Sequence, residues 1–214
     1  HCGVLHVADI GILDNVLEKI APNTFENAPE LWRDQLPTLS INAHKYSRGH
    51  AVVFSGPAHS TGAARLSAMA AARSGAGAVT LLSPPDALAT NAAHLTSIMV
   101  RETRSIKDVE AFLIDRKVAA CVLGPGYGSA KFARDHALML LSAASNHAEH
   151  LKGLVLDADG LTAVEEKPEQ LFNAKRSDHT ALVLTPHEGE FRRLFPDIAA
   201  DNETSKPDKA RQAA

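Results

Sequence analysis

From residue 50 onward the chain alternates between short apolar runs and longer helical stretches, and this alternation constrains the fold more than any other feature. The expected strands cover residues 50–56, 77–83, 96–100, 118–124, 153–159 and 181–185. The expected helices cover residues 61–75, 85–94, 106–116, 130–147, 160–172 and 188–195. Because the strands are almost continuously apolar, the pattern predicts an α/β fold with a mainly parallel sheet and helices on both faces.

The composition excludes several classes of function. The 214 residues are 45% hydrophobic, which is enough for one sizeable core, and the net charge of -3 gives no general attraction to nucleic acid or anionic membrane. No apolar run approaches the roughly 20 residues that span a bilayer. The two cysteines, Cys2 and Cys121, are far apart, so we expect no disulfide framework. With no basic-then-apolar leader, these features predict a cytoplasmic protein.

The two ends of the chain do not follow the repeat. Residues 1–21 contain a strand-like run, and the polar, proline-containing residues 22–42 are typical of a linker to a domain over 43–214. At the other end, Ser205 and Pro207 predict a helix of barely two turns, where a doubly wound sheet would continue into another strand. We therefore expect a C-terminally incomplete piece of a longer protein, whose unpaired sheet edge favours a homo-oligomer.

Small residues follow the first expected strand. In parallel sheets, ligands bind outside the carboxyl ends of the strands, so the residues after each strand are the candidates for a site. Gly56 and Gly62 flank a turn here, and Ser60 or Thr61 can cap the alanine-rich helix that follows. Exposed amides at a helix start attract anions, but tight packing of this helix on the sheet explains the small residues equally well.

The fourth expected strand ends in a turn that contains three glycines. Gly124, Gly126 and Gly128 lie within five positions, whereas a plain strand-to-helix turn needs one or two glycines. The amides of such a turn can face a phosphate or a carbonyl group, so the pattern favours a binding loop. Tyr127 can stack on the ring of a ligand or simply cover the turn.

Two aspartates follow the fifth expected strand. Asp157 and Asp159 point to one face if both lie in the strand, and carboxylates there can hold magnesium through water or accept a proton. Alternatively, Asp159 caps the next helix and Asp157 accepts loop amides. No histidine pair has metal-ligand spacing with a third ligand nearby, so we expect no zinc site. With no nucleophile elbow and no activated cysteine, covalent catalysis is disfavoured.

The last expected strand leads into a helix start. Thr185 at the N-cap, Pro186 at the first helical position and Glu188 three residues after the cap fit that start without any function. Capping by Thr185 leaves His187 and Gly189 unexplained.

In this order, the motifs resemble those of a known family. The stretches "AHKYSRGHAVVFSG", "TGAARLSAMAAARSGAGAVTLLSP", "VLGPGYG", "LVLDADGL" and "LTPHEGEFRRL" are similar to successive motifs of the ADP- or ATP-dependent NAD(P)H-hydrate dehydratases, which belong to the ribokinase-like superfamily. The resemblance covers about residues 43–195. The leading "LHVADIGI" is similar to the end of the NAD(P)H-hydrate epimerase domain that precedes the dehydratase in bifunctional bacterial enzymes, so residues 1–21 would be the tail of such a domain.

The resemblance implies a cofactor-repair reaction, performed by a carbon-oxygen lyase. ADP or ATP, with Mg2+, phosphorylates the hydroxyl of hydrated NADH or NADPH, and the phosphate then leaves to restore the cofactor. The positions that match the hydrate-binding residues of the family are Ala63, Gly126 and His187. The match gives His187 the role of a neutral imidazole that hydrogen-bonds an amide or hydroxyl. Our own candidate for organising the magnesium or phosphate region is Asp157.

The sequence also departs from the family. Family members continue into a strand ending Lys-Gly and a Gly-Ser-Gly-Asp turn, which carry most nucleotide contacts and the catalytic aspartate. Neither occurs here, so the resemblance predicts no catalytic residue in this chain and an inactive fragment. Two other readings stay open: a vitamin-precursor kinase that phosphorylates a small alcohol, against which "TPHEGE" and "AHKYSRGH" argue, and a non-catalytic binding module of the same fold.

Overall fold

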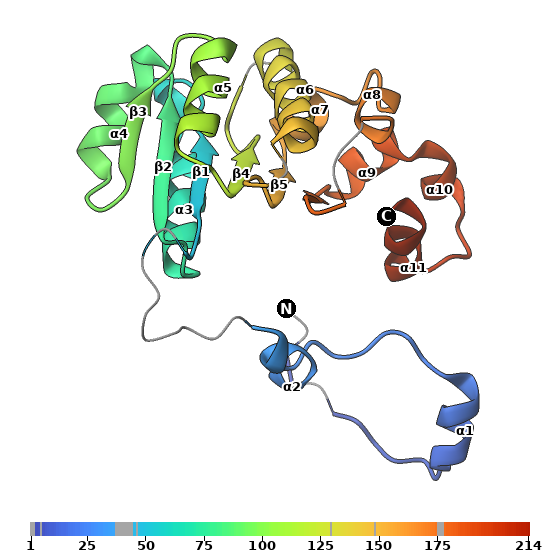
Figure 1. Ribbon diagram of the computed structural model, residues 1–214. Helices are drawn as coiled ribbons and strands as arrows, with labels where there is room; N and C mark the ends of the chain where they lie inside the picture. Colours follow the sequence, from blue (N-terminus) through green and yellow to red (C-terminus); the bar gives the residue numbers. More distant parts are fainter. Residues whose placement is uncertain are drawn as a thin grey trace.

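Six parallel strands form one sheet in the computed structural model, which describes residues 3–4, 6–36, 45, 47–128, 130–147, 149–174 and 178–214. The strand order is β3-β2-β1-β4-β5-β6 (Figure 1). The strands are β1 (His50–Phe54), β2 (Ala78–Ser83), β3 (Met99–Glu102), β4 (Ala120–Leu123), β5 (Gly153–Leu156) and β6 (Ala181–Leu184). The structure confirms the expected α/β fold and each of the six strands, several of them shorter than expected.

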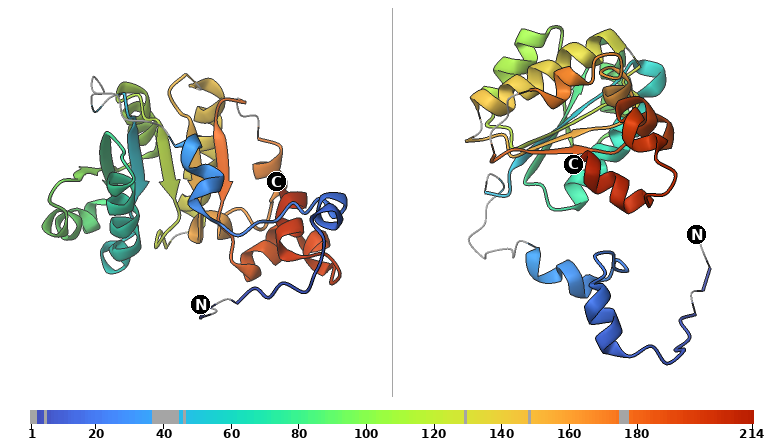
Figure 2. Two further views of the ribbon diagram at one scale, coloured as in Figure 1. Left: turned by 90° about the horizontal axis from the view of Figure 1, so that it is seen from below. Right: turned by 90° about the vertical axis from the view of Figure 1, so that its right-hand side faces the viewer.

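Helices connect the strands and cover the sheet. They are α3 (Thr61–Arg73), α4 (Leu88–His94), α5 (Ile106–Asp115), α6 (Ala130–Asn146), α7 (Asp159–Thr162), α8 (Glu169–Phe172), α9 (Glu188–Leu194), α10 (Pro196–Ala200) and α11 (Lys206–Ala213), with short 3-10 turns η2 (Ala58–Ser60) and η3 (Pro85–Ala87). In the right-hand view of Figure 2, α5 and α6 lie on one face of the sheet, and α3 and α11 lie on the other. Both faces therefore carry helices, as the apolar strands predict.

The hydrophobic core is divided by the sheet into two unequal parts. The larger cluster includes Val52 and Leu154 from the strands and Leu140 from α6, all at most 1% exposed. The smaller cluster lies under α3 and contains Val53 and Ala64. Alternate residues of β4 and β5 are fully buried and half-buried, so the face away from α6 is the less covered one.

Two expectations about residues 153–172 are wrong. Strand β5 ends at Leu156, because Ala158 adopts a positive φ of 43° and the Gly160 amide donates to the Asp157 carbonyl in a turn. Asp157 and Asp159 therefore do not share a strand face. The helix expected over 160–172 is two short helices, α7 and α8, because Pro168 occupies the N-cap of α8 and interrupts a continuous helix.

The segment before the sheet is described over residues 6–36. It contains α1 (Asp14–Ile20), α2 (Pro29–Trp32) and the 3-10 turn η1 (Arg33–Gln35), and none of the described residues from 6 to 13 forms a strand. The expected linker thus includes a short helix, while its residues 37–42 lie outside the described ones, as does Cys2. Arg211 of α11 hydrogen-bonds the Asn23 carbonyl at 2.7 Å. Within the described residues, no helix is long and apolar enough to cross a membrane.

The contrast between buried and exposed leucines gives a direct test of this core. Leu140→Ala removes a side chain with no exposed surface and should lower the free energy of unfolding by roughly 2–5 kcal/mol. The same substitution at Leu66, which is 68% exposed on α3, should change it by no more than about 0.5 kcal/mol. Urea denaturation of both variants measures the difference, and equal losses would contradict the placement of α6 against the sheet.

Candidate functional site

The strand order reverses between β1 and β4, and the glycine-rich turns lie at that point. The two strands are neighbours in parallel register, so the turns that follow them leave the sheet at the same edge. In sheets of this kind, a reversal of strand order opens the crevice in which ligands bind. The turn after β1 contains Gly56, and the turn after β4 contains Gly126.

These two turns are in direct backbone contact. A Cβ atom on Gly56 would lie 1.8 Å from the carbonyl oxygen of Gly126, so only glycine fits. Gly126 has a positive φ of 67°, and the Ser60 hydroxyl donates a 2.7 Å hydrogen bond to its carbonyl oxygen. The turns after β1 and β4 therefore form one continuous surface, which we call the glycine rim (residues 55–60 and 124–128).

The first turn of α3 adjoins the glycine rim. Ala63 is exposed there, and its Cβ would lie 3.7 Å from a Cβ on Gly126. Ser60 occupies the N-cap position, but its hydroxyl is used by Gly126, so neither Ser60 nor Thr61 caps the helix by a side chain. The expected side-chain cap is wrong for this reason. Two of the predicted site residues, Ala63 and Gly126, thus lie side by side.

The turn after β5 packs on the other side of the glycine rim. A Cβ on Gly124 would lie 1.6 Å from the Asp157 carbonyl oxygen, and the Asp159 carboxylate accepts a 2.8 Å hydrogen bond from the Gly128 amide. Asp159 therefore joins two loops and does not cap α7. Asp157 is half-buried, and its carboxylate makes no hydrogen bond or ion pair within the described part of the chain. The positive φ of Ala158 between them is a strained conformation for a non-glycine residue.

The side chain of Tyr127 packs between the turn after β4 and the hydrophobic core. Its hydroxyl lies 3.1 Å from Nδ1 of His136 in α6, and that nitrogen also lies 2.8 Å from the Phe132 carbonyl oxygen. Burial raises the pKa of Tyr127 to about 12 and lowers the pKa of His136. Because the ring packs against the core, covering the turn is the role of Tyr127 that the structure supports.

His187 begins helix α9. Its Nδ1 atom accepts hydrogen bonds from the amides of Gly189 (3.0 Å) and Glu190 (3.3 Å), and the Glu190 carboxylate accepts one from the His187 amide at 2.8 Å. This reciprocal pair is a capping box, in which the imidazole replaces the usual hydroxyl. The expectation that Thr185 is the cap is wrong, because its hydroxyl turns back to the Leu156 carbonyl oxygen.

The capping box explains both residues that the helix-start pattern left open. A Cβ on Gly189 would lie only 2.9 Å from Cε1 of His187, so glycine makes room for the ring. Because Nδ1 accepts hydrogen bonds, the ring proton lies on Nε2, which is 3.2 Å from Glu190 Oε1. The His187 side chain is 68% exposed, so the imidazole ring stands at the surface beyond β6.

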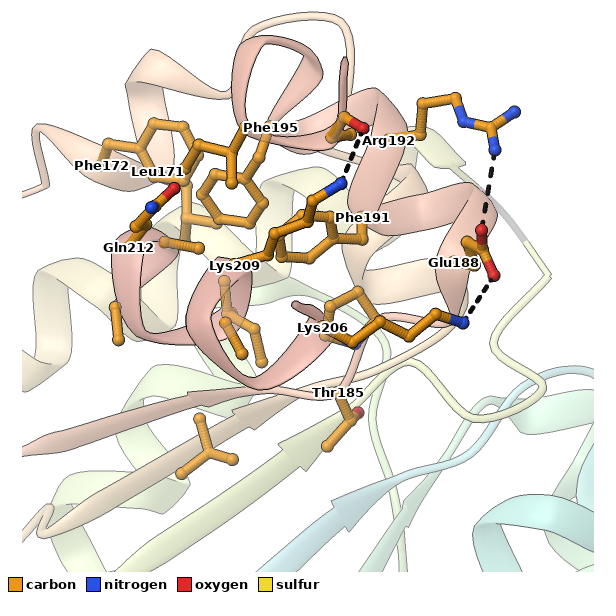
Figure 3. Close-up of a pocket in the computed structure, with 18 of the residues that line it drawn as sticks. Leu171, Phe172, Thr185, Glu188, Phe191, Arg192, Phe195, Lys206, Lys209 and Gln212 are labelled. Carbon is orange, nitrogen blue, oxygen red and sulfur yellow. Dashed lines mark hydrogen bonds and ion pairs between the residues drawn. The ribbon is translucent and has the colours of Figure 1, made fainter. Parts of the chain in front are cut away.

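A separate cavity of about 970 Å³ lies beside β6 (Figure 3). Val183 of β6 and the aromatic rings of Phe191 and Phe195 line the cavity. Glu188, which also lines it, forms ion pairs with Lys206 (3.1 Å) and Arg192 (3.8 Å). None of the four predicted site residues lines this cavity. The cavity is therefore not the site that the sequence predicts, despite its size.

The described residues offer no ready-made metal cage. Among them, no group of three or more histidine, cysteine, aspartate or glutamate side chains could hold a metal ion. Magnesium is commonly held by one or two carboxylates together with substrate phosphates, so a single carboxylate such as Asp157 is compatible with that ion.

The sequence analysis did not identify three buried polar residues at or next to the glycine rim. Asn91 of α4 is fully buried and hydrogen-bonds the hydroxyls of Ser55 and Ser83, at the ends of β1 and β2. The signal available in the sequence was one serine at the carboxyl end of each of two adjacent strands. Nothing in the sequence connects those serines with an asparagine on a helix.

Sequence comparison places these motifs in a known group. Residues 51–214 match the model of a family described as NAD(P)H-hydrate dehydratase. The bifunctional NAD(P)H-hydrate repair enzyme of Gloeobacter violaceus is 40% identical over 178 residues, which are 80% of this chain and 32% of that protein. The ATP-dependent (S)-NAD(P)H-hydrate dehydratase of Nematostella vectensis is 26% identical over 186 residues, 84% of this chain and 50% of that protein. The chain thus spans about a third to a half of these relatives.

Solved structures share the fold. A ribokinase-like superfamily protein from Enterococcus faecalis has a TM-score of 0.67 at 21% identity, covering 90% of this chain and 65% of that one. The ADP/ATP-dependent NAD(P)H-hydrate dehydratase from Bacillus subtilis, co-crystallised with ATP/Mg2+, has a TM-score of 0.59 at 22% identity, covering 87% and 61%. These likenesses show that the fold is ribokinase-like.

The backbone contact at Gly126 predicts a severe effect of a side chain there. Gly126→Val would place Cβ 2.6 Å from the Ser60 carbonyl oxygen and force a β-branched residue into a positive φ, so the glycine rim should open. We expect a lower melting temperature and faster amide exchange over residues 55–60. Gly153→Ala, whose added Cβ meets only Ala120 at 3.8 Å, is the control. Equal exchange in both variants would contradict the contact.

The buried histidine under the glycine rim predicts a pH dependence of stability. Burial lowers the pKa of His136 below 6.5, so the unfolded chain binds a proton in a pH range where the folded chain does not. The free energy of unfolding should therefore fall as the pH drops through about 6.5 and level off below the folded pKa. His136→Gln should flatten this slope in thermal denaturation between pH 8 and pH 5, whereas His94→Gln at an exposed site should not.

Proposed function

The chain belongs to the NAD(P)H-hydrate dehydratase family, and on this premise we propose that it takes part in the nucleotide-dependent dehydration of hydrated NADH and NADPH. The observation that carries the proposal is the glycine rim at the reversal of strand order. Its turns, the first turn of α3 and the His187 cap all follow strands at one edge of a parallel sheet. Such an edge is where parallel sheets bind nucleotide-like ligands.

The spacing of these elements suits a dinucleotide. Strand β5 separates β4 from β6, so the two strands that lead to the Gly126 turn and to His187 run about 10 Å apart at the usual strand spacing. At one end, Ala63 and Gly126 present small side chains and backbone amides to a phosphate or carboxamide group. At the other end, the Nε2–H of His187, which lies 3.2 Å from Glu190 Oε1, would be shared with or transferred to an amide oxygen or a hydroxyl of the substrate. At the His187 contact the Glu190 carboxylate also lies within 3.2 Å of Nε2, so it would orient the ring toward the substrate.

ADP or ATP with Mg2+ is the proposed cofactor. When bound, the nucleotide supplies the phosphoryl group that makes the hydroxyl of the hydrate a leaving group. The half-buried Asp157 carboxylate, next to the glycine rim, would hold the magnesium ion together with phosphate oxygens. Co-crystallisation of the Bacillus subtilis dehydratase with ATP/Mg2+ supports the choice of cofactor.

The proposal extends to the organisation of the protein. We propose that residues 1–21 end an epimerase-like domain and residues 22–42 link it to the dehydratase domain, because relatives named bifunctional match over nearly the whole chain. A homo-oligomer and a cytoplasmic location are also proposed. The latter is supported by Cys121, which is a free thiol in the described part of the chain.

Recovery of NADH absorbance from hydrated NADH tests the proposed reaction. The assay uses a protein that carries residues 43–214 within a complete family domain, with ADP or ATP and Mg2+, and the 214-residue chain alone in parallel. Nucleotide-dependent recovery in the complete domain is the expected result. Phosphorylation of small alcohols without recovery would instead favour the vitamin-precursor kinase, and binding of the hydrate without any turnover would favour the binding module.

Two substitutions at His187 separate its role as a helix cap from its proposed role in binding. His187→Ala removes the cap and the Nε2–H donor, so it should lower stability by about 1 kcal/mol and raise the KM for the hydrate. His187→Asn keeps a strong N-cap residue but loses the imidazole, so it should raise KM with little change in melting temperature. Steady-state kinetics and thermal denaturation measure both. A normal KM for His187→Asn would reduce His187 to a cap.

A further inference from the structure

A buried asparagine connects the ends of β1 and β2. Asn91 has no exposed surface, and its side-chain amide donates hydrogen bonds to the hydroxyls of Ser55 and Ser83, both 3.0 Å long. Ser55 and Ser83 are 2% and 0% exposed. The three side chains therefore form a polar cluster inside the protein, directly under the carboxyl ends of two neighbouring strands.

The side-chain nitrogen of Asn91 faces both serine hydroxyls. Because the Asn91 amide donates to both serine oxygens, each hydroxyl keeps its own proton for another acceptor. Ser55 lies 3.1 Å from the Gly56 carbonyl oxygen and donates to it, and Ser83 donates to the Pro84 carbonyl oxygen at 3.1 Å. One amide thus sets the orientation of two hydroxyls and, through them, of two carbonyl groups in the turns after β1 and β2.

Two chains of hydrogen bonds start at Asn91, one through Ser55 and one through Ser83, and both lead to the glycine rim. The Ser55 branch ends at Gly56, whose α-carbon lies against the carbonyl of Gly126. The Ser83 branch enters η3, where the Asp86 carboxylate accepts a 3.0 Å hydrogen bond from the Ala58 amide. The turn over residues 55–60 is therefore held from two sides by groups that converge on Asn91.

The cluster is not optimised for stability alone. The Asn91 Oδ1 atom is buried and has no hydrogen-bond partner in the described part of the chain. An unpaired buried oxygen costs stability, and an apolar side chain of similar size would avoid that cost. The amide at this position thus contributes something that an apolar residue would not, namely the two fixed hydroxyls.

We propose that Asn91 is a positioning residue for the substrate site: through Ser55 it holds Gly56 against Gly126 and so fixes the rim that contacts the hydrate. The inference rests on the proposed function for its consequence in catalysis, but not for its structural part. Asn91 itself does not reach the surface and touches no substrate.

Two variants remove the hydrogen-bond connection from Asn91 through Ser55 to Gly56 in different ways, and a third variant serves as a matched control. Asn91→Asp keeps the shape but exchanges the donor for an acceptor, so the Ser55 proton turns away from Gly56. Ser55→Ala deletes the hydroxyl itself. The control is Thr180→Val, which removes an equally buried hydroxyl that donates to the Leu151 carbonyl oxygen at 2.6 Å. Thr180 precedes β6 and so lies at the amino edge of the sheet, away from the glycine rim.

Hydrogen exchange on the 214-residue chain tests the structural part of the proposal. Ser55→Ala and Asn91→Asp should each speed amide exchange in residues 55–60 and also in 124–128, whereas Thr180→Val should leave both segments as in the wild type. Ser55→Ala decides the matter if the buried aspartate prevents folding. Unchanged exchange over 124–128 in Ser55→Ala would overturn the proposal.

Kinetics in the complete family domain test the consequence for catalysis. The loss of one orienting hydrogen bond should raise the KM for the hydrate about three- to tenfold, with kcat within about twofold of wild type. Thr180→Val should keep the wild-type KM even if its melting temperature falls as much as that of Ser55→Ala. Equal KM values in Ser55→Ala and wild type would overturn the positioning role. A wild type without dehydratase activity would instead refute the proposed function and leave the exchange result to decide the structural part.

Discussion

The backbone contact between Gly56 and Gly126 is the constraint on which the site depends. It joins the turns of two adjacent strands where the strand order reverses, and it leaves no space for a side chain at either glycine. Because that contact closes the space between β1 and β4, the first turn of α3 stands directly beside the turn after β4. A surface made of backbone amides and small side chains follows from this, and it suits ligands whose contacts are carbonyl and phosphate oxygens.

His187 shows how one side chain can serve both the fold and the site. Its Nδ1 atom satisfies amides at the start of α9, which places the ring proton on Nε2, at the exposed side of the ring and 3.2 Å from Glu190 Oε1. A hydroxyl cap would hold the helix equally well but would not present a ring nitrogen at the surface. The imidazole at this position is therefore consistent with a demand from the site as well as from the helix.

The sequence predicted the sheet well because buried parallel strands are continuous apolar runs, which need no knowledge of long-range contacts. It also brought Ala63, Gly126 and Asp157 to one edge, since each follows a strand. The prediction failed where a side chain could hydrogen-bond either to a neighbour in the sequence or to a distant residue. The Thr185 hydroxyl donates to the Leu156 carbonyl oxygen, so His187 caps the helix instead. Asn91 hydrogen-bonds two serines that belong to other elements. Such choices depend on packing in three dimensions, which periodicity does not encode.

The glycine rim and the last helix, α11, are held in place by different kinds of interaction. The glycine rim is fixed by buried hydrogen bonds and close backbone contact, whereas α11 is joined to α9 by the exposed ion pair of Glu188 with Lys206, which holds the pKa of Glu188 below its usual range. Dissolved salt screens exposed charges but hardly reaches buried amides. Raising the ionic strength should therefore loosen the last helix of this chain and leave the glycine rim as it is.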